Sequence, residues 1–192
     1  MKYSIRKQFA MVFCLLMAGS ILLCWFINST FLERYYLNSK QKAMLNAYQI
    51  INKASNEDTI KSEDFDIEFQ KICGKYNINI ILLDAETRTI KTSINDYEVL
   101  SRQLLDYLFN KSVTEKDEVL IAGESYEMHI KMDEHTGLEY IDMWGVLDNG
   151  NLFLFRSPVE GIRESVGLAN RFRGYVGIAS AVFSALIILW VS

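Results

Sequence analysis

Two apolar stretches, one near each end of the chain, limit what this sequence can fold into. No charged residue occurs from Phe9 to Ile27 or from Gly174 to Ser192. Each stretch is close to the roughly 20 residues that a helix needs to span the hydrocarbon core of a bilayer. We therefore predict a membrane protein with transmembrane helices at 9–30 and 174–192 and a folded region between them.

A cleaved signal peptide is the alternative interpretation of the first stretch, because basic residues before an apolar run serve either purpose. No small-x-small cleavage site follows Ile27, and the bulky Leu23 stands where a lipoprotein signal needs a small residue. These flanks favour an uncleaved membrane anchor.

The basic residues beside the apolar stretches indicate the orientation. Lys2, Arg6 and Lys7 precede the first stretch without an acidic residue among them, which predicts a cytoplasmic tail at residues 1–8. Arg171 and Arg173, just before the second stretch, oppose this orientation mildly. We expect a two-pass protein of the plasma membrane with its amino terminus in the cytoplasm and its middle region outside.

The middle region is acidic. All 24 acidic residues and all but three of the 20 basic residues lie between Phe31 and Arg173, which gives this region a net charge of about −7. Such a surface favours cations, cationic peptides or simple solubility, and nothing in it indicates nucleic-acid binding. The acidic clusters at 63–68, 115–118 and 133–135 are predicted to be solvated helix ends and turns.

The pattern between the apolar stretches is that of an α+β domain. A helix is predicted to continue out of the membrane to about Ala54, and further helices are expected at 64–76 and 95–112. Strands are predicted at 78–84, 89–93, 118–122, 125–132, 138–147 and 151–155. Asp148-Asn149-Gly150 is a tight-turn signal, so the last two strands should be antiparallel neighbours. This order predicts helices packed on one largely antiparallel sheet.

A strong helix start follows the last strand. Ser157 is predicted to cap the helix, Pro158 to occupy its first position and Glu160 to complete a capping box. No proline follows Pro158, so this helix should run into the second apolar stretch. We predict that Ser157, Pro158 and Glu160 form a rigid joint that transmits movement, because a simple anchor would not need one.

Small residues recur every four positions in the second apolar stretch, at Gly177, Ala181 and Ala185. Such a face lets another helix pack closely, either the first crossing or that of a second copy. In the second case the chain associates with itself, and a homodimer is the expected assembly.

Catalytic and metal-binding signals are weak. His129 and His135 flank Asp133 and Glu134, but they belong to different predicted elements, and a metal site needs a fuller set of ligands. Cys73 is the only cysteine between the apolar stretches and is expected to be a small buried residue, without a disulfide partner in that region. We predict no metal, no cofactor and no catalytic residue in this chain.

The layout resembles a known family. The segment FLERYYLNSKQKAMLNAYQIIN follows the first apolar stretch and RSPVEGIRESVGLANRF precedes the second. Together with the two crossings, they resemble the sensor region of bacterial two-component histidine kinases with an extracytoplasmic PAS-like or Cache-like domain. The resemblance implies the following division: cytoplasmic tail 1–8, first crossing 9–30, sensor domain 31–157, signalling helix 158–173 and second crossing 174–192.

In that family the chain continues into a HAMP linker, a helix with the phosphorylated histidine and an ATP-binding domain, which acts on a response regulator. His135 is followed by Thr136 and Gly137, so it does not match the phosphoacceptor motif, and no nucleotide-binding box occurs. The resemblance therefore implies the input half of such a kinase. The alternatives are a small two-pass scaffold or transporter accessory protein, and a receptor coupled to a chemotaxis or cyclic-nucleotide output.

The resemblance also implies a pocket for an unidentified extracellular ligand between the sheet and its helices. We expect this pocket near INIILLD at 78–84 and EYIDMWGV at 139–146.

Overall fold

The structure is a computed structural model of the whole chain. It describes the backbone of residues 5–95, 97–109, 117–133 and 136–191. Side chains are described for these residues except 5–7, 9–11, 13–14, 28–29, 162 and 184–191.

The chain divides into two compact units. One consists of residues 38–160, and the other combines residues 1–37 with residues 161–192. Helix α1 (Ile5–Asn56) contributes to both units, and helix α4 (Glu160–Val191) begins at the end of the first.

A six-stranded sheet forms the centre of the 38–160 unit. Its strand order is β2-β1-β6-β5-β4-β3, and all paired neighbours are antiparallel. The strands are β1 (Asn79–Leu83), β2 (Thr89–Thr92), β3 (Glu118–Ala122), β4 (Tyr126–Met132), β5 (Glu139–Val146) and β6 (Leu152–Pro158). The predicted α+β class, with flanking helices on an antiparallel sheet, is confirmed.

Two further helices belong to this unit, α2 (Glu63–Tyr76) and α3 (Tyr97–Phe109). Both lie where the sequence predicts helices, at 64–76 and 95–112. Ser62 caps α2 by accepting a hydrogen bond from the Phe65 N–H at 3.2 Å, which satisfies one of the free N–H groups of the first turn. Asn77 ends α2 in the left-handed conformation, with φ 49°.

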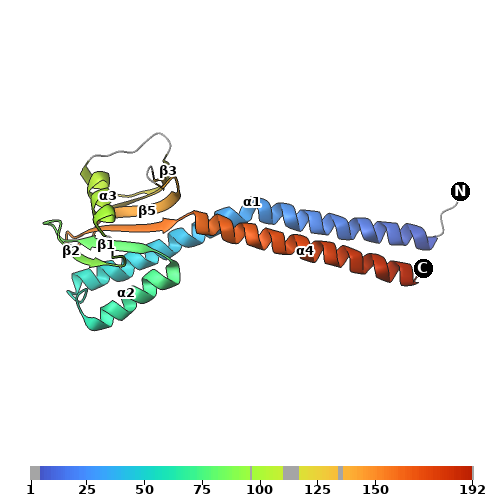
Figure 1. Cartoon of the computed structure of the whole chain (residues 1–192), viewed down its shortest axis with the longest axis horizontal. Coiled ribbons are helices and arrows are strands. Elements are labelled where there is room, and N and C mark those ends of the chain that lie inside the picture. The colour runs from blue at the N-terminus through green and yellow to red at the C-terminus, as the bar shows by residue number, and fades with distance from the viewer. Residues whose placement is uncertain (1–4, 96, 110–116, 134–135, 192) are drawn as a thin grey trace. The chain divides into compact units, whose positions relative to one another are not determined.

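Helices α1 and α2 cover one face of the sheet, and α3 covers the other (Figure 1). On the first face, the ring of Tyr48 from α1 lies 4.9 Å from that of Tyr126 and 5.3 Å from that of Phe153, between centroids. On the second face, Leu100 and Leu104 of α3 pack in a buried cluster with apolar residues of β1, β5 and β6. Because neighbouring residues of a strand point to opposite faces, each strand contributes to both layers.

The turn between β5 and β6 is held against the end of α1. Gly150 adopts a φ of 87°, and the Leu147 N–H donates to the Asn151 carbonyl at 2.8 Å, so the predicted tight turn is confirmed. Asn52 of α1 donates to the Asp148 carboxylate at 2.7 Å and accepts from the Asp148 N–H at 3.0 Å. This pair of hydrogen bonds connects α1 to the hairpin that contains β6.

The predicted capping box at Ser157 is wrong. Ser157 lies inside β6, fully buried, and its hydroxyl donates to the Asn77 carbonyl at 2.8 Å instead of capping a helix. Pro158 is the last residue of β6, opposite Tyr140 of β5, and not the first residue of a helix. Strand pairing continues further than the local sequence signal indicates, and α4 begins only at Glu160.

The passage from strand to helix is nevertheless as short as predicted. Val159 is the one residue between β6 and α4, it is buried, and its N–H donates to the Glu139 carbonyl at 2.9 Å. Glu160 is exposed at the start of α4.

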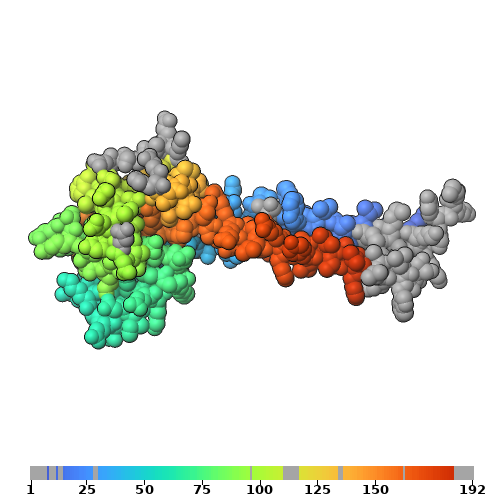
Figure 2. Space-filling model, in the orientation of Figure 1, coloured from blue at the N-terminus to red at the C-terminus, as the bar shows by residue number. Residues whose placement is uncertain are grey.

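In the second unit, parts of α1 and α4 pack side by side (Figure 2). Arg163 pairs with Glu33 at 3.1 Å, and a Cβ atom added to Gly177 would lie 3.2 Å from Ile21 Cγ2. Gly177 of the predicted small-residue face is thus turned toward α1, whereas the side chain of Ala185 lies outside the described residues.

Among the described residues, one helix is long and apolar enough to cross a membrane, the part of α1 from Leu15 onward. The second predicted crossing, 174–192, falls partly on residues whose side chains are not described, and it stays a prediction.

Candidate functional site

The candidate site lies on the α3 face of the sheet, where polar residues replace the apolar layer. Glu127, His129 and Lys131 alternate along β4 and therefore point to the same face. Trp144 of β5 is paired with Glu127, so the two side chains are neighbours on that face.

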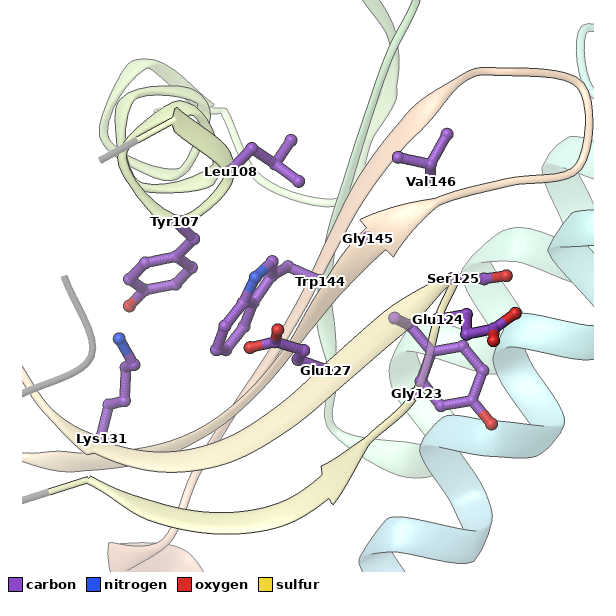
Figure 3. A pocket seen from close by; sticks show the side chains of 11 residues that line it. Tyr107, Leu108, Gly123, Glu124, Ser125, Glu127, Lys131, Trp144, Gly145 and Val146 are labelled. Atoms are coloured by element: carbon purple, nitrogen blue, oxygen red, sulfur yellow. The ribbon is translucent and has the colours of Figure 1, made fainter. Parts of the chain in front are cut away.

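A cavity of about 390 Å³ opens between α3 and the hairpin of β3 and β4. Figure 3 shows the side chains that surround it. They come from Tyr107, Leu108, Gly123, Glu124, Ser125, Tyr126, Glu127, Lys131, Trp144, Gly145 and Val146. A volume near the lower end of the range for ligand pockets indicates a small molecule as the occupant.

Gly145 allows the hairpin to approach β5 and so shapes one wall of the cavity. A Cβ atom at this position would lie 2.2 Å from the Ser125 carbonyl oxygen, which is backbone and unable to move aside. The Val146 N–H donates to the same carbonyl at 3.0 Å.

Lys131 lines the cavity with its charge already compensated. Its ammonium lies 3.2 Å from the Asp117 carboxylate, and both side chains are only 8% exposed. The same nitrogen lies 4.3 Å from the Tyr107 ring centroid and 5.2 Å from that of Trp144 (Figure 3). Both rings thus already interact with a cation.

A buried ionic network lies beside the cavity and includes Tyr107. The Tyr107 hydroxyl donates to Asp142 at 2.8 Å, and the Arg156 Nε atom lies 3.3 Å from the other Asp142 oxygen. Arg156 also pairs with Asp133 at 2.9 Å and donates to Gln103 of α3. Because Arg156 belongs to β6, this network joins the cavity wall to the strand that precedes α4.

Burial dominates the electrostatics of this network. Complete burial raises the pKa of Asp142 to about 6, against the opposing effect of the Arg156 charge and the Tyr107 hydrogen bond. Burial and the neighbouring Asp142 charge also raise the pKa of Tyr107. The carboxylate therefore gains a proton more easily than an exposed aspartate would.

His129 is buried between Glu127 and Trp144. Its Nε2 atom lies 3.2 Å from a Glu127 oxygen, and its ring centroid lies 4.7 Å from that of Trp144. Neither ring nitrogen forms an aligned hydrogen bond with the described part of the chain. Burial lowers the pKa of His129, so its imidazole is neutral near pH 7.

The residues predicted to transmit a signal do not line the cavity. Ser157 and Pro158 belong to β6, and Glu160 begins α4. Of the two segments near which a pocket is expected, EYIDMWGV contributes Trp144, Gly145 and Val146 to the cavity lining, whereas residues 80–83 of INIILLD are fully buried in the core.

The predicted metal candidates give no cluster. His129 and Asp133 lie in separate surroundings, and His135 and Glu134 fall outside the described residues. Within the described ranges, no group of three or more His, Cys, Asp or Glu side chains is placed to hold a metal ion.

Cys73 is no nucleophile in this arrangement. It is partly buried on α2, and burial raises the pKa of its thiol to about 11, so little thiolate exists near neutral pH. The chemistry of the described site is that of binding through charge and aromatic faces.

Sequence reasoning missed most of this site. The alternation of Glu127, His129 and Lys131 was present in SYEMHIKM and marks one polar face of β4. Nothing in the sequence indicated that Tyr107 of α3 would lie over that face. Asp117 and Asp133, predicted to be solvated, are buried as partners of Lys131 and Arg156.

Comparison of the chain with protein-family models, with curated proteins and with solved structures found no match.

Proposed function

We propose that this chain is the signal-receptor region of a two-component sensor histidine kinase. The 38–160 unit acts as an extracytoplasmic PAS-like sensor between two transmembrane helices, with the amino terminus in the cytoplasm. The receptor works as a homodimer, and ligand binding outside changes the activity of an ATP-dependent kinase module and its response regulator inside.

One observation carries the proposal: the cavity is connected to the strand that continues into α4. Tyr107 lines the cavity and bonds to Asp142, which pairs with Arg156 of β6. Only Val159 separates the end of β6 from α4. A ligand that displaces Tyr107 therefore acts on β6 through Asp142 and Arg156. The single residue between β6 and α4 is too short a linker to absorb a movement of β6.

The position of β6 supports this role. It lies in the interior of the sheet, between β1 and β5, and its pairing with β5 extends from Leu152 to Pro158. A strand fixed on both sides moves with the sheet. Two apolar terminal stretches and the basic amino-terminal tail support the membrane placement.

A chimera tests the proposal without any ligand. Residues 1–192 are fused to a histidine kinase module, and autophosphorylation is measured for the parent and for Tyr107→Phe, which removes the hydrogen bond to Asp142. We expect the substitution to change kinase activity several-fold. Two glycines inserted after Val159 should abolish this difference, because they let β6 move without α4.

The matched control places the same two glycines after Glu86, in the exposed turn between β1 and β2. This insertion should leave the effect of Tyr107→Phe intact. An equal effect of Tyr107→Phe with and without the insertion after Val159 would refute the proposed coupling.

A further inference from the structure

The polar wall of the cavity carries an excess of negative charge. Glu124 and Glu127 both line it, and Lys131, the cation among the described lining residues, is paired with Asp117 at 3.2 Å. The Glu127 side chain is 44% exposed and lies 3.2 Å from His129, which burial holds neutral. Within the described residues, no ion pair with a charged lysine or arginine neutralises Glu127.

The aromatic wall already holds one ammonium group. Tyr107 and Trp144 line the cavity, and the Lys131 ammonium lies over both rings. Only 4% of Trp144 is exposed, so the neighbouring Glu127 carboxylate supplies most of the attraction for a further cation. The ring faces carry negative charge density, which favours a cation over an anion. Among the described lining residues, the one cation, Lys131, is paired with Asp117.

Glu127 and Trp144 lie next to each other across the pair of β4 and β5 (Figure 3). A carboxylate beside an aromatic ring supplies both the charge and the ring face that an ammonium group uses. Leu108 and Val146 add an apolar surface to the same cavity. One charged end and one apolar body are thus accommodated within about 390 Å³.

From these contacts we propose that the cavity binds a small organic amine, with its ammonium group at Glu127 and Trp144 and its apolar part against Leu108 and Val146. This assignment rests on the proposed receptor function and gives it a ligand class.

Three probes of the same shape test the proposal on the full chain in lipid nanodiscs. They are 2-phenylethylamine, the neutral 2-phenylethanol and the anionic 3-phenylpropanoate, and binding is measured by calorimetry. We expect the amine to bind at least tenfold more tightly than either of the others. Glu127→Gln should weaken amine binding at least tenfold, because it removes the charge and keeps the shape.

Glu86→Gln is the matched control, since Glu86 is an exposed carboxylate that does not line the cavity. It should leave amine binding unchanged. Binding of the alcohol or the acid as tight as that of the amine, absence of amine binding, or undiminished amine binding by Glu127→Gln would overturn the amine assignment. The receptor proposal is tested separately by the chimera, which contains no ligand.

Discussion

Asp142→Asn should change how the stability of the 38–160 unit depends on pH. Asp142 is completely buried, and burial raises its pKa in the folded protein to about 6, against about 3.9 for an aspartate in an unfolded chain. A group whose folded pKa is raised binds its proton more tightly in the folded state. Its stabilising contribution is therefore fully present below about pH 4 and is lost as pH rises through about 6.

The size of the effect follows from these two pKa values. Between pH 7 and pH 5, the linkage relation gives about 1 kcal/mol of added stability for the wild type, out of about 3 kcal/mol over the whole range. Asparagine does not titrate, and its amide oxygen still accepts the hydrogen bond from Tyr107. The difference in unfolding free energy between wild type and variant isolates the pH-dependent contribution of Asp142, because the other titrating groups are common to both proteins.

Urea unfolding at pH 5, 6 and 7 measures this difference in nanodiscs. With Trp25 and Trp190 replaced by phenylalanine, the fluorescence of Trp144 reports on the buried network directly. The wild type should gain about 1 kcal/mol on the variant as pH falls from 7 to 5. A constant difference, or a loss by the wild type, would refute the assignment of a raised pKa to Asp142.

Three further predictions concern the packing and are tested in the same unfolding assay or by labelling. Gly145→Ala should destabilise the unit by at least about 2 kcal/mol, because its Cβ meets backbone at 2.2 Å, whereas Gly74→Ala, with open space around it, should stabilise α2 by about 0.5–1 kcal/mol. Equal effects of the two substitutions would contradict the close approach at Gly145. Asp148→Ala should cost about 1 kcal/mol through the lost hydrogen bond from Asn52, and an unchanged urea midpoint would show that this contact adds nothing. With the other two cysteines replaced by serine, Cys73 should react with iodoacetamide at pH 8 about 100-fold more slowly in the folded than in the unfolded chain, because burial raises its pKa to about 11; similar rates would disprove this.

The elements could be predicted because their signals are local. Alternation in SYEMHIKM, the Asp148-Asn149-Gly150 turn that follows EYIDMWGV, and helical spacing in YEVLSRQLLDYLF each depend on neighbouring residues. The structure places strands and a helix at these positions.

The helix start after β6 shows where local signals fail. Ser157, Pro158 and Glu160 have the residue types of a capping box, but Ser157 and Pro158 are paired with Ile141 and Tyr140 of β5. A contact with a strand that is distant in sequence gives Ser157 a different hydrogen-bond partner, the Asn77 carbonyl. Tertiary pairing thus overrides the capping preference.

The charged surroundings of the cavity could not be predicted, because they depend on which charged side chains are buried next to each other. The sequence predicts that Asp133 belongs to a solvated acidic cluster. In the structure its side chain is buried against Arg156 of β6. Likewise, the pairing of Lys131 with Asp117 is visible only once β3 lies beside β4. Local sequence does not distinguish a charge that is solvated from one that has a buried partner.

In the proposed receptor, a ligand in the cavity controls an output beyond α4. The most direct measurement is autophosphorylation of the nanodisc-embedded chimera as 2-phenylethylamine is titrated. We predict that kinase activity changes with a midpoint equal to the dissociation constant measured by calorimetry, and that Glu127→Gln shifts both values together by at least tenfold. Kinase activity that stays constant while the amine saturates the cavity would show that the cavity does not control the kinase.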